Sequence, residues 1–202
     1  MPASKTEIAN MALNHLASER EIQDVDTDRS NEAMACRRFW DTCRDALLRS
    51  YPWPFATKTA GLALVATNPT DEWAYSYQYP SDCLALRRIH SGSRMDSRQS
   101  RIPYAIVQGA AGKLILTDAA NAVADYTVRI VETQYWDPDF VLAFSARLAF
   151  YIAPRVTGGD PFGLGKRAMQ LFGMEVSSAE SGAGNEEQPE EDPGSEFERA
   201  RA

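Results

Sequence analysis

The sequence predicts a mainly α chain with a β insertion, an α+β fold built on a four-helix bundle. Apolar residues recur at helical spacing in two segments near the N-terminus and in two nearer the C-terminus. Between them, from about 60 to 132, the apolar pattern has the period of two that is typical of strands. We therefore expect an antiparallel strand-rich insertion between the second and third helix. The expected parts are bundle at 1–58 and 134–178, insertion at 59–133 and an extended acidic tail at 179–202.

The first two helices have recognisable starts and buried faces. Ser4 and Glu7 have the spacing of a capping box, which predicts a helix over about 5–18. A polar connector follows, and the second helix is expected over about 30–49. Opposite charges three or four residues apart, such as Arg37 and Asp41, suit its exposed side. Its predicted buried stripe consists of Cys36, Trp40, Cys43 and Leu47, and Pro52 and Pro54 end it.

Strand signals fill the middle of the chain. Aromatic residues occupy every second position from Trp73 to Tyr79, with small or polar residues between them. Glycines at 109 and 112 predict a hairpin connection, and the polar segment 91–101 predicts a mobile loop between strands. Further strands are expected at 84–89, 104–108, 113–117 and 126–131.

Two Asp-Pro pairs predict the starts of the last two helices. Asp137 suits an N-cap and Pro138 the first helical position, and this helix should end near 157–158. Asp160-Pro161 repeats the signal for the fourth helix. The expected apolar faces are Phe140, Phe144, Leu148, Tyr151 and Ile152 on the third helix, and Met169, Phe172 and Val176 on the fourth.

Charge is unevenly distributed along the chain. The net charge is −7, and segment 179–202 alone, with eight acidic residues and two arginines, contributes −6. The body is therefore close to neutral, which argues against a protein that binds nucleic acid through bulk positive charge. The tail is rich in Glu, Ser, Gly and Pro, so that on its own it should be disordered.

The sequence contains no segment that is typical of a secretory signal or a membrane span. The N-terminal residues lack an apolar segment typical of a secretory signal, and no apolar run reaches the length of a membrane span. Three cysteines, an odd number, argue against a disulfide framework and favour a reducing compartment. We expect a protein in the cytoplasm of the cell that makes it, with no membrane association.

The residue types that carry catalysis are sparse, so we expect no enzyme, cofactor or metal. His15 and His90 are interpreted as structural or surface histidines, and Cys36, Cys43 and Cys83 as small hydrophobes. Segment 158–167, GGDPFGLGKR, departs from a phosphate-binding loop at Asp160 and Arg167. Asp24, Asp26 and Asp28 open like a calcium loop but lack its later Gly and Glu, so capping of the second helix explains them better.

Two groups of side chains suit contacts with partners. The aromatic series 73–79 could stack nucleic-acid bases, although packing in a core or interface is favoured. A basic cluster could touch DNA phosphates, or, as we slightly prefer, an acidic protein surface like that of the tail. Its members are Arg87, Arg88, Arg94, Arg98 and Arg101.

Three segments together resemble one protein family. They are TEIANMALNHL (6–16), ACRRFWDTCRDALLRSYPWPFA (35–56) and WAYSYQYPSDCLALRRI (73–89). The chain is similar here to the head-to-tail adaptor proteins of short-tailed bacteriophages, also called tail tubular protein A. The shared pattern is Arg-Asp, Leu-Leu-Arg and a Pro-Trp-x-Phe-Ala turn, then a Tyr-x-Tyr-x-x-Pro-x-Asp-Cys-Leu strand. The resemblance is close over about 6–90, with Ser50-Tyr51 and Pro54 where many relatives have His and Asn.

The resemblance implies a structural virion protein without enzymatic activity. Such adaptors form a homo-oligomeric ring, typically of twelve subunits, between the portal protein and the tail nozzle protein. Phage DNA passes through the central channel during ejection without sequence-specific binding. The ring contacts would be head-to-tail around the axis. The remaining alternatives are another head-completion or tail-terminator connector, or a small hydrolase or nucleic-acid-binding protein.

If the chain is an adaptor subunit, we expect two regions to hold its parts together or to contact partners. Pro52, Trp53, Pro54 and Phe55 form a rigid aromatic corner that joins the bundle to the strand insertion, or packs on a neighbouring subunit. The acidic tail is expected to extend onto the portal or an adjacent subunit, or else to act as a solubilising segment. The expected partner contacts are Arg94, Arg98 and Arg101 in the loop, with Phe197, Arg199 and Arg201 in the tail.

Overall fold

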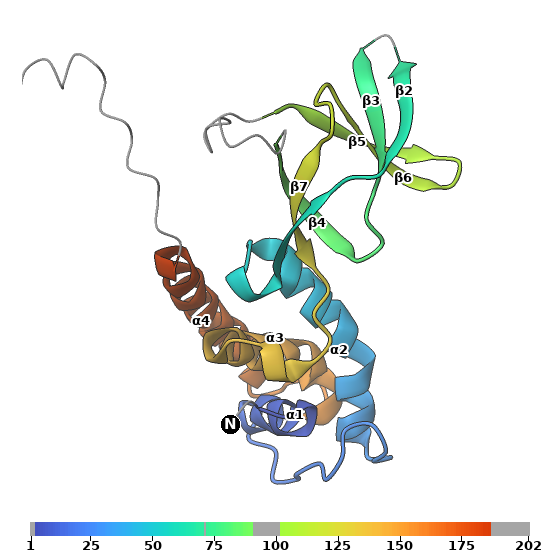
Figure 1. Ribbon diagram of the computed structural model, residues 1–202. Helices are drawn as coiled ribbons and strands as arrows, with labels where there is room; N and C mark the ends of the chain where they lie inside the picture. Colours follow the sequence, from blue (N-terminus) through green and yellow to red (C-terminus); the bar gives the residue numbers. More distant parts are fainter. Residues whose placement is uncertain (1–2, 71, 91–101, 187–202) are drawn as a thin grey trace, which may run out of the picture.

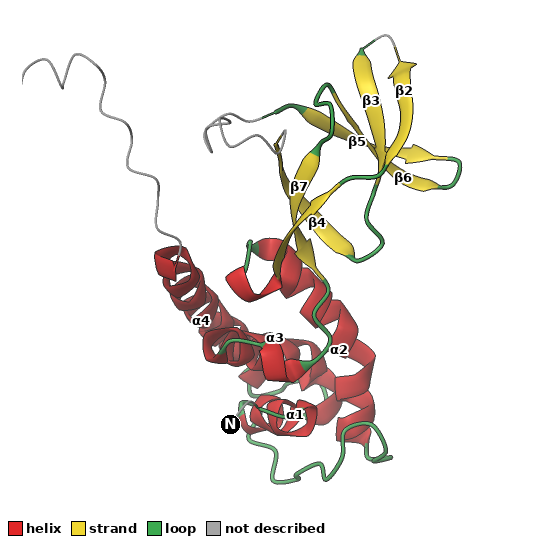
Figure 2. Cartoon of the chain, viewed as in Figure 1, coloured by secondary structure: helices red, strands yellow, loops and turns green. Residues whose placement is uncertain are grey.

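The computed structural model describes residues 3–70, 72–90 and 102–186, and shows an α+β protein (Figure 1). Helices occupy one end of the molecule and strands the other, as Figure 2 shows by colour. The helices are α1 (Lys5–Asn14), α2 (Asn31–Ser50), α3 (Pro138–Val156) and α4 (Leu164–Glu186). The strands are β1 (Thr57–Gly61), β2 (Leu64–Thr70), β3 (Trp73–Gln78), β4 (Cys83–His90), β5 (Tyr104–Gly109), β6 (Gly112–Thr117) and β7 (Val123–Val128).

Helix α1 begins with the predicted capping box and ends earlier than predicted. The Ser4 hydroxyl accepts from the Glu7 amide, and the Glu7 carboxylate accepts from the Ser4 amide. The helix stops at Asn14 rather than near residue 18 because Ala17 adopts a left-handed conformation with φ of 51°. The amide of Ser18 then donates back to the Leu13 carbonyl, which is the pattern of a Schellman helix end.

Helix α3 lies at the centre of the helical part and contacts α1, α2 and α4. Phe140, Phe144, Leu148 and Ile152 are completely buried, as predicted. Tyr151 is the exception, because it is partly exposed and stacks on Phe39 of α2. The predicted stripe of α2 is buried throughout, and its Trp40 packs on Trp136 and Phe144.

The start of helix α4 differs from the prediction. Asp160 and Gly163 both have left-handed backbone conformations, with φ of 58° and 66°, so the helix cannot run through them. It begins at Leu164, and the Asp160 carboxylate accepts from the Gly165 amide in its first turn. Asp160 therefore caps the helix from four residues upstream instead of from the adjoining position.

The end of helix α4 corrects the expected boundary of the tail. The helix continues to Glu186, so residues 179–186 are helical and not extended. Ala179 and Ala183 are buried within the helical core, which explains why a segment of polar composition is ordered. Gly184 lies close to the Tyr51 hydroxyl at the end of α2. The remainder of the tail, 187–202, lies outside the described residues.

The strands form two antiparallel sheets. One has the order β1-β7-β4 and the other β2-β3-β6-β5. Every predicted strand is present within two or three residues of its expected limits, and the predicted connection at 109–112 joins β5 to β6. Strands β1 and β2 were not predicted, because the side chains of β2 are largely exposed and show no alternation. Strands β4 and β7 pack on α2, which places the three-stranded sheet next to the helices.

A second, smaller core lies between the two sheets. Tyr77, Ile89 and Ile115 are its large buried members, and Tyr75 and Tyr79 pack against it. The Tyr77 hydroxyl donates to the Ala119 carbonyl at 2.7 Å. The alternating aromatic side of β3 therefore faces this core, as the packing interpretation predicts, and Tyr77 is not available for stacking on bases.

Candidate functional site: the joint between helices and strands

The corner that follows α2 is built on its own backbone. The indole Nε1 of Trp53 donates to the Leu47 carbonyl at 2.9 Å, so the chain folds back on the last turn of the helix. The Trp53 carbonyl accepts from the Ala56 amide and from the hydroxyl of Thr57. Thr57 is the first residue of β1. Pro52 and Pro54 restrict φ on both sides of Trp53. The direction in which the chain leaves α2 is thereby tightly constrained.

The aromatic rings of the corner pack inside the subunit. Trp53 is buried, and its ring lies 5.2 Å from that of Phe140 in an edge-to-face arrangement. Phe55 also meets Phe140, at 5.1 Å, and Tyr51 meets Trp53 at 5.3 Å. Such ring pairs contribute about 0.5–1.5 kcal/mol each beyond their buried area. The corner therefore holds the end of α2 against the start of α3.

Arg87 of β4 ties the strands to the end of α2. Its Nη2 donates to the carbonyls of Leu48, Arg49 and Tyr51 at 3.2, 3.0 and 2.8 Å. The carbonyls of Leu48 and Arg49 are among those that a helix end leaves without backbone partners. The Arg87 Nε donates to the Thr127 hydroxyl of β7 at 2.9 Å, which orients the guanidinium. A positive charge at a helix C-terminus is also favoured by the helix dipole.

Sequence reasoning placed Arg87 and Arg88 in a cluster facing a partner, and the structure corrects this. Arg87 is engaged by α2, and Arg88 binds the carboxylate of Asp125 at 2.7 Å. No pattern in the sequence singled out Arg87, because its acceptors are backbone carbonyls about 40 positions away. The other expected partner contacts lie outside the described residues: Arg94, Arg98, Arg101, Phe197, Arg199 and Arg201.

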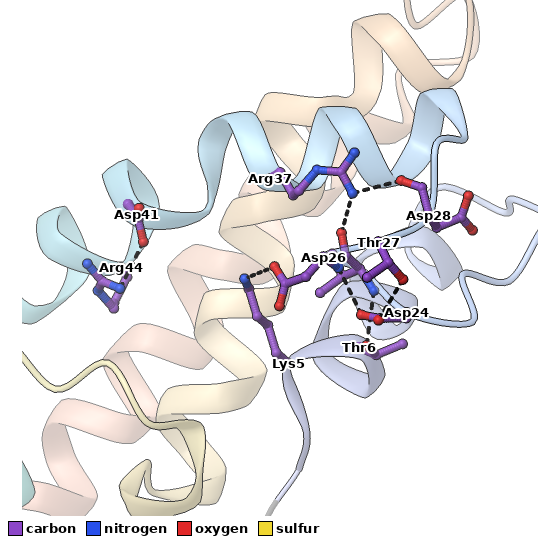
Figure 3. Close-up of polar contacts among 10 residues, drawn as sticks. Lys5, Thr6, Asp24, Asp26, Thr27, Asp28, Arg37, Asp41 and Arg44 are labelled. Atoms are coloured by element: carbon purple, nitrogen blue, oxygen red, sulfur yellow. Dashed lines mark hydrogen bonds and ion pairs between the residues drawn. The ribbon is translucent and has the colours of Figure 1, made fainter.

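Ion pairs add further ties across the joint. Asp45 of α2 pairs with Arg129, which follows β7, at 3.0 Å and with Arg44 at 2.8 Å. Arg44 also pairs with Asp41, as its spacing predicts (Figure 3). The Asp45–Arg129 pair crosses the joint and is partly exposed, so it contributes about 0–1 kcal/mol. The two pairs of Arg44 lie within α2 and give its buried guanidinium acidic partners.

A polar cluster lies on the three-stranded sheet beyond Arg87. Asp125 of β7 accepts from the Thr59 hydroxyl of β1 at 2.6 Å and from Arg88 of β4, and lies 3.5 Å from the ring of His90. Burial acts to raise the pKa of Asp125, but hydrogen bonds from Thr59 and Arg88 outweigh it, so its pKa lies below the ordinary value. The cluster connects all three strands of this sheet.

The connector between α1 and α2 uses its aspartates to stabilise turns (Figure 3). Asp24 accepts from the Asp26 amide and the Thr27 hydroxyl, and the hydroxyl bond is the main reason for its lowered pKa. Asp28 accepts from the Ser30 amide, and Asp26 pairs with Lys5. The cap of α2 is Ser30 itself, so the prediction that the aspartates cap this helix is wrong.

Arg37 also departs from its predicted role. Instead of pairing with Asp41 along α2, its Nη1 donates to the carbonyls of Val25 and Asp28 in the connector, at 2.5 and 2.7 Å (Figure 3). Bonds from a charged guanidinium to backbone carbonyls are stronger than neutral hydrogen bonds. A pair with the largely exposed Asp41 would contribute only about 0–1 kcal/mol. Arg37 thereby closes the connector onto the helix.

His15 and two of the three cysteines are engaged in contacts within the helical part. His15 bonds to the Ser145 hydroxyl at 3.1 Å, and burial lowers its pKa. Burial raises the pKa of Cys36 to about 12 and of Cys43 to about 11, so both thiols stay protonated at neutral pH. Among the described residues, no three His, Cys, Asp or Glu side chains are grouped so as to hold a metal. No helix in the described ranges is long and apolar enough to cross a membrane.

No protein-family model matches this sequence, and no curated protein matches it as a relative.

Proposed function

We propose that this protein is a structural adaptor subunit of a short-tailed phage, which forms a ring between the portal and the tail nozzle. The observation that carries the proposal is the joint at Arg44–Ala56. The segments that resemble the adaptor family contain both Arg87 and the backbone carbonyls at the end of α2 that it binds, and these bonds tie the strands to the helical part. They also contain Trp53, which is buried with its ring against Phe140 of α3. A ring of identical subunits requires such a fixed orientation, because each subunit must present the same two surfaces.

The arrangement of the chain supports this interpretation. The strands lie between α2 and α3 in sequence, and α3 contacts all three other helices, as expected of a helical bundle with a β insertion. Figure 1 shows the helices and the four-stranded sheet at opposite ends of the subunit. Opposite ends suit a protein that binds one partner above and another below, here the portal and the nozzle.

The charge of the chain is compatible with a channel for DNA. With a net charge of −7, the subunit offers no overall attraction for phosphates. A channel wall without strong positive charge lets DNA slide through, whereas many phosphate contacts would bind it in a salt-dependent way. We propose that the ring encloses DNA without reading its sequence.

The test is to mix the purified protein with its cognate portal and image the complex. We expect closed rings, typically of twelve subunits, attached to one face of the portal. Binding to a tail tube instead of the portal would identify another connector, such as a tail terminator. Tight DNA binding by the isolated subunit that weakens steeply with salt, without rings, would overturn the proposal in favour of a nucleic-acid-binding protein.

A further inference from the structure

The four-stranded sheet has two exposed edges that carry large apolar side chains. The edge strands are β2 and β5, and in the part of the chain that the structure describes neither pairs with a strand on its outer side. Leu64 and Val65 of β2 are 53% and 52% exposed, and Ile106 and Val107 of β5 are 46% and 37% exposed. Exposed sheet edges of this kind are templates for pairing with another chain.

One row of apolar residues crosses the whole sheet and ends at both edges. Leu64 pairs with Tyr77, Tyr77 with Ile115, and Ile115 with Ile106. Directly paired residues point to the same face of a sheet, so these four side chains form one continuous row. Its middle members, Tyr77 and Ile115, are buried, whereas its ends are half exposed. The row is therefore incomplete at both of its ends.

Neither edge carries the charges that usually prevent edge-to-edge association. The sequences LVATNPT of β2 and YAIVQG of β5 contain no Lys, Arg, Asp or Glu, in a chain with 24% charged residues. Lysine and inward-pointing charges are the common protection of an edge strand in a monomer. Pro69, which lacks an amide hydrogen, limits pairing of β2 to about Leu64–Thr67. The edges are thus open to a neutral partner strand, over a short length.

The direction of the two edges fits a second copy of this chain. All neighbours in the sheet are antiparallel, so with four strands β2 and β5 run in opposite directions. When a second sheet is placed beside the first in the same orientation, β5 of one copy meets β2 of the next as an antiparallel pair. The part of β2 that is free to pair, about Leu64–Thr67, is shorter than the six residues of β5, so β5 can cover it fully. In an isologous contact, in contrast, β2 would pair with β2 of the other copy, or β5 with β5.

We propose that β5 of one subunit pairs with β2 of the next subunit, so that the row from Leu64 to Ile106 continues from copy to copy. This inference rests on the proposed function and deepens it, by naming the surface through which neighbours in the ring meet. The contact is head-to-tail, and it closes into a ring when the rotation between copies permits. Each contact is short, and closure of the ring strengthens the contacts jointly.

Cysteine crosslinking between two variants tests the pairing. Cys36 and Cys43 are buried, and Cys83→Ser provides a background without a partly exposed thiol. In that background, Leu64→Cys and Ile106→Cys proteins are mixed at high concentration and oxidised. We expect a disulfide-linked dimer in the mixture, little in either protein alone, and a ladder of oligomers from the double variant. Facing residues of an antiparallel pair lie at a suitable distance for a disulfide.

The control pair is Leu64→Cys with Val131→Cys, because Val131 is equally exposed but lies outside both edges. A mixture of Leu64→Cys and Ile106→Cys that crosslinks no more than this pair overturns the proposal. Crosslinking of each variant with itself overturns the head-to-tail arrangement. If rings form on the portal but the edge crosslink does not, the proposed function stands and the edge pairing is wrong. If the crosslink forms but the protein does not bind the portal, the edge pairing stands and the proposed function is wrong.

Discussion

At the scale of single residues, Arg87 is the side chain on which the orientation of the strands most depends. One guanidinium meets the three carbonyls of Leu48, Arg49 and Tyr51 and one hydroxyl, and it connects β4, β7 and the end of α2. Hydrogen bonds to a charged donor contribute more than neutral ones, and the carbonyls of Leu48 and Arg49 lie in the last turn of α2, where a helix offers no backbone partner.

Replacing Arg87 should therefore destabilise the protein. We expect Arg87→Ala to lower the free energy of unfolding by about 1–3 kcal/mol, and Arg87→Lys to restore part of it, because an ammonium keeps the charge but not the planar geometry. Urea denaturation measures the difference. Arg129→Ala is the matched control, since its exposed ion pair with Asp45 contributes only about 0–1 kcal/mol. Equal losses in both variants would contradict the special role of Arg87.

Asp125 makes stability depend on pH. Its pKa is lowered in the folded state, so its contribution is fully present above the unfolded pKa of about 3.9 and is lost as the pH falls through the folded value. We expect Asp125→Asn to cost about 1 kcal/mol at pH 7, a modest figure because water screens the partly exposed cluster. The gap between variant and wild type should narrow as the pH falls below the unfolded value and close once the pH has fallen through the folded one. A gap that does not narrow on acidification would show that packing and not charge is responsible.

At the scale of elements, the pairing of α3 with α4 depends on small residues at their crossing. A Cβ on Gly165 would lie 2.5 Å from the Cβ of Ala153, closer than two carbon atoms can approach. By propensity alone, a glycine in this turn would only weaken the helix. The structure shows that its small size allows the two helices to pack together.

Two glycines of α4 should respond oppositely to the same substitution. We expect Gly165→Ala to destabilise by about 1–3 kcal/mol, because α4 must move away from α3. Gly173→Ala should stabilise by about 0.5–1 kcal/mol, since a Cβ there meets nothing within 4 Å and alanine favours the helix. Thermal unfolding of both variants gives the comparison. Stabilisation by both changes would mean that the helices can separate without cost.

The C-terminal part of α4 gives a second prediction at this scale. A chain ending at residue 186 keeps Ala179 and Ala183 in the core, whereas one ending at 178 removes them. We expect the first truncation to leave the free energy of unfolding nearly unchanged and the second to lower it by several kcal/mol, as deleted core groups do. Denaturant titration of both proteins distinguishes them. Portal binding by the chain ending at 186 then tests the proposed contact of 187–202 separately from folding.

At the scale of the whole molecule, the joint should couple two cores that share few direct contacts. Trp40, Trp53 and Trp136 belong to the helical core, whereas Trp73 lies in β3. We expect the part of the fluorescence change that Trp73→Phe removes to have the same urea midpoint as circular dichroism reports for the helices, because the joint makes unfolding cooperative. Arg87→Ala should lower the midpoint of that Trp73 signal below the midpoint of the helices. Separate midpoints before this change would contradict a rigid joint.

The sequence alone determined the features that depend on neighbours along the chain. The cap at Ser4, the start of α3 at Pro138, the buried stripe of α2, the alternating side of β3 and the turn at 109–112 each follow from side chains within a few positions of one another. Composition, in contrast, misplaced the end of α4, since local polarity does not reveal that Ala179 and Ala183 will be covered.

Only the tertiary structure decided the features that depend on groups distant in sequence. Arg87 gained its role because β4 brings it to carbonyls at the end of α2, and Asp125 because β7 lies between Thr59 and Arg88. Strand β2 is ordered through its pairing with β3, without a buried face of its own to predict it. The physical reason is the same in each case: a hydrogen bond or ladder forms with whichever partner the fold brings near, and the identity of that partner is not encoded locally.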